Sequence, residues 1–202
     1  MNKSLKTLDL FAGIGGVRLG FERAGLETVF ANDIEPKCKP VYDANFKDCK
    51  LTVGDINAID IKSLPDFDLL LGGFPCQSFS IAGYKKGFAD KGRGDLFFRI
   101  AEIVEEKKPR AIFLENVKNL VSHDNGRTFQ IVKETLEGLG YFVATQVMNT
   151  REYSDIPQNR ERIYIVAFKD KKAFGKFKFP EKVKAQKAIS EFLEEKVDKK
   201  YD

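Results

Sequence analysis

Short apolar runs alternate with longer amphipathic stretches along most of this 202-residue chain. The apolar runs are typical of buried strands and lie at residues 6–11, 27–32, 50–53, 68–71, 111–114, 142–148 and 162–168. Amphipathic stretches predict helices at 17–24, from the second strand to about residue 46, at 95–107 and at 127–139. This alternation predicts an α/β fold with a mostly parallel sheet and helices on both faces.

The last two predicted strands depart from that order, because only the loop 149–161 separates them. A crossover between parallel neighbours needs a longer connection, so one strand of the pair is expected to run antiparallel. The result is a seven-stranded sheet with one antiparallel strand. After residue 168 the chain becomes rich in lysine, with a short amphipathic helix expected at 188–196. We therefore assign a domain to 1–168 and a tail or linker to 169–202.

The composition is that of an ordinary globular protein, 43% hydrophobic and 32% charged. Three cysteines without a Cys-x-x-Cys pair, and a single histidine, disfavour a metal site and a disulfide framework. No stretch has the character of a signal peptide or a bilayer span, so we expect a cytoplasmic protein without a membrane partner. The net charge of +4 lies in the tail, which holds 11 Lys and 7 acidic residues. This is a weak indication of nucleic-acid binding.

The strongest candidate for chemistry is Cys76, in the sequence Gly-Gly-Phe-Pro-Cys-Gln-Ser that follows the apolar run 68–71. Ligands bind at strand ends in open α/β sheets, and a thiolate in a partly exposed polar site is a nucleophile. The alternative is a small buried core cysteine. The following loop, 77–94, carries four glycines and a cluster of basic side chains, so it is predicted to close over a polyanion. A disordered surface loop is the other interpretation.

Polar groups also follow other predicted strands. The glycine-rich turn at 9–16 suits a nucleoside cofactor, and Asp33 suits the hydroxyl groups of an unphosphorylated ribose. Ile34 and the pair Asp55-Ile56 are then candidates for contacts with the base. Glu115 is expected beside Cys76. The alternatives are a plain tight turn at 9–16, an Asx turn at Asp33, and caps at both Asp55 and Glu115.

Two arginines, Arg160 and Arg162, stand two residues apart at the start of the last predicted strand, so both side chains point the same way. They are candidates for the pocket of Cys76 and Glu115. Exposed salt bridges are the alternative.

These residues, in this order, resemble the DNA (cytosine-5) methyltransferase family over residues 5–168. The matching segments are Phe11-Ala-Gly-Ile-Gly-Gly16, Gly54-Asp-Ile56, Gly73-Phe-Pro-Cys-Gln77, Asp95-Leu-Phe-Phe98, Glu115-Asn-Val117 and Gln158-Asn-Arg-Glu-Arg-Ile-Tyr164. The resemblance implies a Rossmann-like, S-adenosylmethionine-dependent methyltransferase fold. It also implies methylation of C5 of cytosine in double-stranded DNA within a restriction-modification system, with S-adenosylhomocysteine as product and no metal.

The resemblance further implies roles for single residues. Cys76 attacks C6 of a flipped cytosine, Glu115 binds the ring through N3 and the amine, and Arg162 and Arg160 position Glu115 or contact the base. The implied cofactor residues are Phe11, Gly13, Ile14, Gly15, Asn32, Asp33, Ile34, Asp55, Ile56, Pro75 and Leu96. The implied DNA contacts are Gln77, Ser80, Lys85, Arg93 and Asn116.

The similarity stops before the family's target-recognition region and its last two motifs, one of which supplies a helix beside the first motif. We therefore expect exposed apolar surface where that helix packs. The alternative to an active enzyme is a truncated or split-enzyme subunit that is inactive without a second polypeptide. An NAD-dependent oxidoreductase is disfavoured, because no Gly-x-Gly-x-x-Gly follows the first strand. RNA is a lesser alternative to DNA as substrate.

Overall fold

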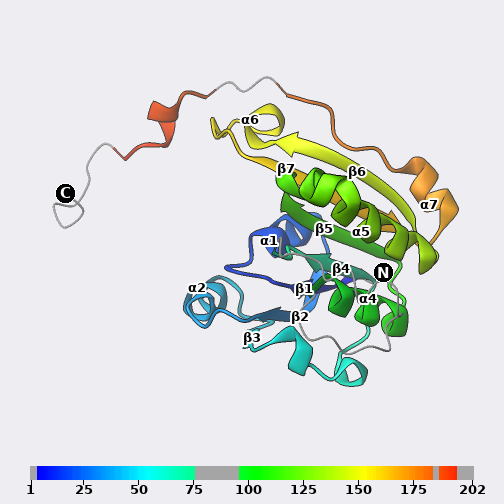
Figure 1. The fold of residues 1–202 in the computed structure, drawn as a ribbon. Coiled ribbons are helices and arrows are strands. Elements are labelled where there is room, and N and C mark those ends of the chain that lie inside the picture. The colour runs from blue at the N-terminus through cyan, green and yellow to red at the C-terminus, as the bar shows by residue number, and fades with distance from the viewer. Residues whose placement is uncertain (1–3, 76–95, 184–186, 195–202) are drawn as a thin grey trace.

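A computed structural model describes residues 4–75, 96–183 and 187–194. Within these ranges seven strands form one sheet (Figure 1). The strands are β1 (Lys6–Leu10), β2 (Glu27–Asp33), β3 (Leu51–Val53), β4 (Leu69–Gly72), β5 (Ala111–Val117), β6 (Phe142–Asn149) and β7 (Glu161–Phe168). The α-helices are α1 (Gly16–Arg23), α2 (Cys38–Asn45), α4 (Leu96–Lys107), α5 (Arg127–Gly138), α6 (Thr150–Tyr153) and α7 (Lys171–Lys176). The 3-10 turns are η1 (Ile56–Ala58), η2 (Ile61–Ser63), η4 (Lys118–Val121), η5 (His123–Gly126) and η6 (Ile189–Phe192).

The strand order is β3-β2-β1-β4-β5-β7-β6. Strands β1 to β5 pair in parallel, and β7 runs antiparallel to both β5 and β6. The prediction of one antiparallel strand among seven is confirmed. The chain leaves β1 toward β2 and β3 on one side and returns to β4 and β5 on the other. In sheets of this kind, such a reversal opens a crevice at the carboxyl ends of the strands.

Side chains alternate between two cores because neighbouring strand residues face opposite sides of the sheet. Leu8 and Leu10 belong to the larger core, with α4 residues such as Phe97 and Ile100 and with α5. In the second core Tyr42 of α2 packs among its buried members, which are Ala12, Ala31, Phe46 and Leu51. Helix α1 covers the sheet through Phe21, whose ring meets Phe113 edge-on at 5.1 Å between centroids.

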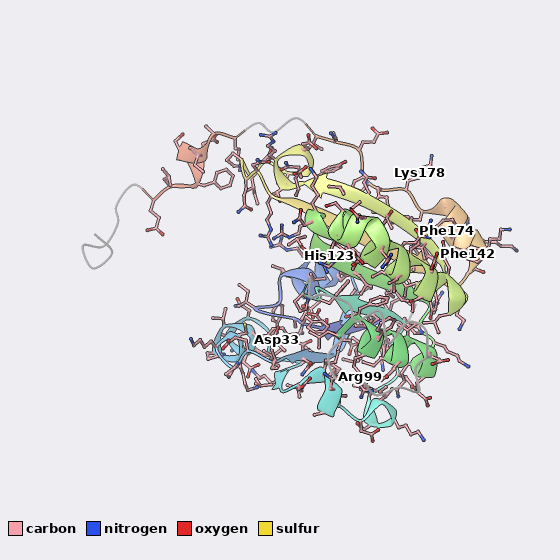
Figure 2. The ribbon with its side chains drawn as sticks, in the orientation of Figure 1. Asp33, Arg99, His123, Phe142, Phe174 and Lys178 are labelled. Atoms are coloured by element: carbon pink, nitrogen blue, oxygen red, sulfur yellow. The ribbon has the colours of Figure 1, made fainter. Side chains whose placement is uncertain are left out.

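The first part of the tail packs against the sheet through its aromatic side chains. Phe174 of α7 lies 5.7 Å from Phe142 of β6 between ring centroids (Figure 2), and Phe177 lies 5.3 Å from Phe168. The helix expected at 188–196 is wrong over its described part, where only the single turn η6 forms. Ile189 and Leu193 are largely exposed there, so an apolar helix face has no core against which to fold.

Candidate active site

The glycine-rich turn after β1 is held to β2 by backbone and side-chain hydrogen bonds. The N–H of Gly13 donates to Asp33 Oδ2 at 2.8 Å, and the N–H of Ala12 donates to the Asn32 carbonyl at 3.0 Å. Phe11, Gly13 and Gly15 all have positive φ, of 55°, 53° and 90°. Such a backbone suits glycine, and it brings N–H groups close to any ligand bound over the turn.

The carboxylate of Asp33 marks the end of β2 (Figure 2). Its Oδ1 accepts the N–H of Glu35 at 2.8 Å, so the Asx turn named as its alternative interpretation is present. A carboxylate offers about four acceptor sites, and the bonds to Gly13 and Glu35 use two of them. Asp33 therefore keeps acceptor capacity for a ligand hydroxyl while it anchors the turn.

The end of β3 is tied to β2 by Asn32, which is buried. Its amide donates to the carbonyls of Thr52 and Gly54, both at 3.0 Å. Asn32 thus fixes the spacing of two strand ends, and its predicted cofactor contact stays a prediction.

The remaining predicted cofactor residues differ in exposure. Ile14 and Ile34 are 60% and 66% exposed, which is unusual for isoleucine beside a folded turn. Asp55 is exposed and caps η1 through the N–H of Asn57, as its alternative interpretation predicted. Ile56 is buried in the larger core, and Leu96 packs against that core. Ile14 and Ile34 therefore offer large exposed apolar side chains beside the turn.

Glu115 and Arg162 form an ion pair where β5 meets β7. Arg162 Nε lies 2.8 Å from Glu115 Oε1, and the two side chains are 19% and 22% exposed. Glu115 also faces the end of β4, because a β-carbon placed on Gly73 would lie 3.7 Å from its Oε2 and 4.0 Å from the Phe11 carbonyl. The structure thus brings the first strand, the Gly73 segment and the carboxylate together.

Asn116 shapes the segment that leads to the predicted nucleophile. It is buried, and its amide donates to the Phe74 carbonyl at 2.9 Å. Pro75, the last described residue of this segment, is exposed. A direct DNA contact from Asn116 and a cofactor contact from Pro75 stay predictions.

Five predicted site residues lie outside the described residues: Cys76, Gln77, Ser80, Lys85 and Arg93. Arg160 is described and exposed, and its backbone N–H donates to the Gln158 carbonyl at 3.0 Å. The expectation that Arg160 faces the same pocket as Arg162 stays a prediction.

Comparison with known proteins decides the family. Residues 5–202 match the profile of C-5 cytosine-specific DNA methylases. The chain belongs to this family. It is 52% identical over 177 residues to the Type II methyltransferase M.Bsp6I of Bacillus sp. (strain RFL6), covering 87% of this chain and 56% of that protein. It is 53% identical over 189 residues to the Type II methyltransferase M.NgoBI of Neisseria gonorrhoeae, covering 94% and 57%.

This methylase-family chain thus spans little more than half the length of the curated relatives it matches. Among solved structures it resembles a mutant of Spodoptera frugiperda DNMT2, with a TM-score of 0.79, 23% identity and coverage of 98% of this chain and 62% of that one. It also resembles S. pombe Dnmt2, with a TM-score of 0.74, 24% identity and coverage of 98% and 63%. These likenesses concern the fold, and they agree with the predicted Rossmann-like methyltransferase architecture.

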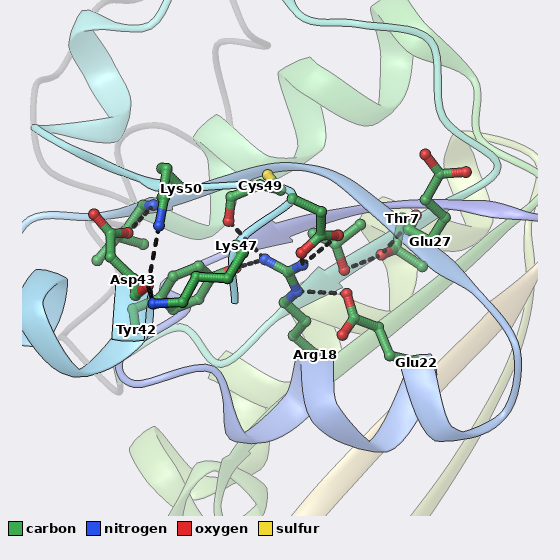
Figure 3. A network of polar contacts seen from close by, with 12 residues as sticks. Thr7, Arg18, Glu22, Glu27, Tyr42, Asp43, Lys47, Cys49 and Lys50 are labelled. Carbon is green, nitrogen blue, oxygen red and sulfur yellow. Dashed lines mark hydrogen bonds and ion pairs between the residues drawn. The ribbon is translucent and has the colours of Figure 1, made fainter. Parts of the chain in front are cut away.

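A buried arginine beneath the glycine-rich turn escaped the sequence analysis. Arg18 of α1 is fully buried and makes five hydrogen bonds, as many as its N–H donors (Figure 3). The partners are Glu22 Oε1, the Tyr42 hydroxyl, the Cys49 carbonyl and both carboxylate oxygens of Asp48, at 2.6 to 3.0 Å. Burial opposes its charge, but hydrogen bonds to Tyr42 and Glu22 outweigh burial and raise the pKa of Arg18.

Phe46 connects this cluster to the turn itself. Its ring centroid lies 4.1 Å from Arg18 Cζ, and a β-carbon on Gly15 would come within 2.2 Å of its Cε2. In this methylase-family chain, Gly15 is therefore required for packing as well as for its backbone angle. The i,i+4 spacing of Arg18 and Glu22 suggests an ordinary surface pair, so local sequence gave no sign of burial.

The described residues, 4–75, 96–183 and 187–194, contain neither a metal-binding cluster nor a membrane-spanning helix. No group of three or more His, Cys, Asp or Glu side chains there is arranged to hold a metal ion. None of the helices described is both long and apolar enough to cross a bilayer.

Proposed function

We propose that this chain carries the catalytic part of an enzyme that methylates C5 of cytosine in double-stranded DNA, within a Type II restriction-modification system. The observation that carries the proposal is the approach of Glu115, Gly73 and Phe11 at the crevice between β1, β4 and β5. It joins the predicted cofactor turn to the segment that precedes Cys76. Membership of the methylase family and relatives named as Type II methyltransferases support the substrate.

The cofactor proposed is S-adenosylmethionine, and the residues present fit it. Asp33 keeps acceptor sites for ribose hydroxyls, and the exposed side chains of Ile14 and Ile34 offer apolar surface for a base. The N–H groups of the turn and Asp55 complete the proposed binding set. When bound, S-adenosylmethionine supplies the methyl group, leaving S-adenosylhomocysteine.

The protein's own groups would act on the cytosine. Its ring is shielded in the duplex, so the base must first be flipped into the pocket. The Cys76 thiolate then forms a bond to C6, which makes C5 nucleophilic. The carboxyl group of Glu115, oriented by Arg162, donates a hydrogen bond to N3 and so stabilises the negative charge that forms on the ring. After C5 has been methylated a base removes its proton, and the bond between Cys76 and C6 breaks.

DNA binding is assigned to the segment after Pro75. Gln77 and Ser80 are proposed to contact the backbone or the flipped base, and Lys85 and Arg93 to contact phosphates. These contacts rest on the resemblance to the methylase family.

A second candidate function is that of a subunit, inactive until another polypeptide binds. An apolar groove of about 360 Å³ supports it, with Phe21 of α1 on one side and Phe177 and Phe179 of the tail among its lining residues. The floor of the groove is one face of the sheet and carries Phe113 and Tyr164. The other face of the sheet packs against α4 and α5 in the larger core.

Transfer of a labelled methyl group from S-adenosylmethionine to mixed-sequence duplex DNA tests both candidates. The chain is assayed alone and with the part of M.Bsp6I that lies outside the match, and each assay includes Cys76→Ala. Label that enters DNA from the parent alone, but not from the variant, supports an autonomous enzyme. Label that appears only after addition of the second part supports the subunit. No label under either condition, together with no binding of S-adenosylhomocysteine, would overturn the proposal.

A further inference from the structure

Asp9 is a carboxyl group buried in the middle of the sheet. It lies in β1, where it pairs with Ala31 of β2 and Leu71 of β4. The residue is 1% exposed, and within the part of the chain that the structure describes its Oδ2 has no hydrogen-bond partner. A buried polar atom in this state is uncommon, because the loss of hydration is not compensated.

The nearby cation does not satisfy Asp9. Arg18 already makes five hydrogen bonds to other groups, so it has no N–H left for this carboxyl. Its charge is also more than balanced, since Glu22 and Asp48 are both ion-paired to it. An ionised Asp9 would therefore add a second excess negative charge to a buried cluster.

The groups around Asp9 come from several elements. Arg18 and Glu22 of α1, Asp33 of β2 and Tyr42 of α2 all interact with it electrostatically, as does the Cys49 thiol. Burial raises the pKa of Asp9 to about 7, with smaller upward contributions from Asp33 and Glu22 against a lowering by Arg18. The cluster thus favours the neutral acid.

Asp9 is coupled to the glycine-rich turn through Asp33. Asp33 holds the Gly13 N–H at 2.8 Å, and that bond anchors the turn to β2. The two carboxyl groups interact electrostatically, and repulsion from Asp33 disfavours the ionised form of Asp9. Asp9 also lies at the start of the segment 9–16 that contains the turn.

We propose that Asp9 is a proton-linked positioning residue, which holds the glycine-rich turn in its binding geometry while protonated and loosens it when the proton leaves. The consequence for cofactor affinity rests on the proposed function, whereas the movement of the turn does not.

The first experiment needs no cofactor. The carboxyl carbon of Asp9 and the amide resonances of Gly13 and Gly15 are followed by NMR from acid to mildly alkaline pH. A shared midpoint near neutrality is expected, and Asp9→Asn should abolish the movement of both amides at that midpoint. Titration of Asp9 at the ordinary value for aspartate, or amides that stay still while it titrates, would overturn the proposal. The parent measurement suffices even if the variant does not fold.

The second experiment measures S-adenosylhomocysteine binding by calorimetry across the same range. Affinity of the parent should fall roughly tenfold between about pH 6 and about pH 8.5, because the fraction of molecules with protonated Asp9 falls with each pH unit above the midpoint. Asp9→Asn should flatten this profile, whereas Glu105→Gln, at an exposed position of α4, should keep it. Equal profiles for parent and Asp9→Asn refute the link. Absence of binding at every pH contradicts the proposed function, and the NMR titration then decides the link alone.

Discussion

Arg18 and Arg162 both bind carboxylates, and they do so in contrasting ways. Arg18, beneath the glycine-rich turn, is fully buried, and its hydrogen bonds extend to α1, α2 and the segment before β3. Arg162, at the ends of β5 and β7, is partly exposed and uses Nε for Glu115 and Nη1 for the Glu161 carbonyl. Among the described residues its Nη2 has no hydrogen bond, so Arg162 keeps capacity for a substrate whereas Arg18 keeps none.

The difference distinguishes the cluster around Arg18, which supports the fold, from the site around Arg162 and Glu115, which is proposed to take part in the reaction. Saturated hydrogen bonds in a buried site fix geometry, and loss of one partner leaves others unpaired. Unfilled capacity in a partly exposed site leaves groups able to change partners during a reaction. Substitutions around Arg18 should therefore lower mainly the stability of the protein. Substitutions around Arg162 should lower mainly its activity.

The largest effect is expected at Glu115. Glu115→Gln keeps the shape but removes the carboxyl group that acts on N3, so methyl transfer should fall about 10²- to 10⁴-fold. Binding of S-adenosylhomocysteine should change little, because the proposed cofactor residues do not include Glu115. Activity close to that of the parent would show that Glu115 has no catalytic role.

Asp9 should dominate the pH dependence of stability beneath the turn. Its folded pKa of about 7 exceeds the ordinary 3.8, so the folded state binds the proton more tightly. The free energy of unfolding should fall as pH rises from about 4 to about 7, by up to about 4 kcal/mol from this group. Urea unfolding at a series of pH values measures the slope. Asp9→Asn should reduce it, and an unchanged slope would show that other groups cause it.

Arg18→Met should destabilise the protein by about 3 kcal/mol, the lower end of the cost of breaking a buried pair. The cost is at that end because Asp48 is largely exposed and can turn to water. The same substitution at Arg23, an exposed position of the same helix, should leave the urea midpoint nearly unchanged. Equal midpoints for the two variants would contradict a supporting role for Arg18.

Two neighbouring glycines give a matched test of the turn. Gly15→Ala should cost about 1–3 kcal/mol, because its β-carbon meets the Phe46 ring and its φ is 90°. Gly16→Ala meets nothing within 4 Å and lies in the first turn of α1, so it should be neutral or gain up to about 1 kcal/mol. Thermal unfolding of both variants tests this difference. Equal losses of stability would show that the turn tolerates alanine at neither position, whatever the packing.

The smallest change in stability is expected at Arg162. Arg162→Met should lower the free energy of unfolding by no more than about 1 kcal/mol, as is usual for a partly exposed ion pair. Methyl transfer should nevertheless fall, because Glu115 loses the group that orients it. A large loss of stability would place Arg162 with Arg18 among the supporting residues.

Local pattern predicted the strands well, because apolar runs and the glycine-rich turn are short-range signals. The exceptions involve long-range contacts. β5 continues through Glu115 to Val117 because it pairs with β7, and Arg18 is buried because Tyr42 and Asp48 close over it from elsewhere in the chain. The sequence also contains a signal for the buried acid, because Asp9 stands between Leu8 and Leu10 in a central strand.

The position of β7 also has a consequence for how the protein is made. This strand comes last in the sheet along the chain, yet it inserts between β5 and β6. A nascent chain that has not yet released β7 from the ribosome exposes an unpaired edge on β5 and leaves β6 without its neighbour. The pairing of β7 with β5 joins segments far apart in sequence, so it is expected to be late and slow. The chain is therefore expected to aggregate most readily before this pairing forms.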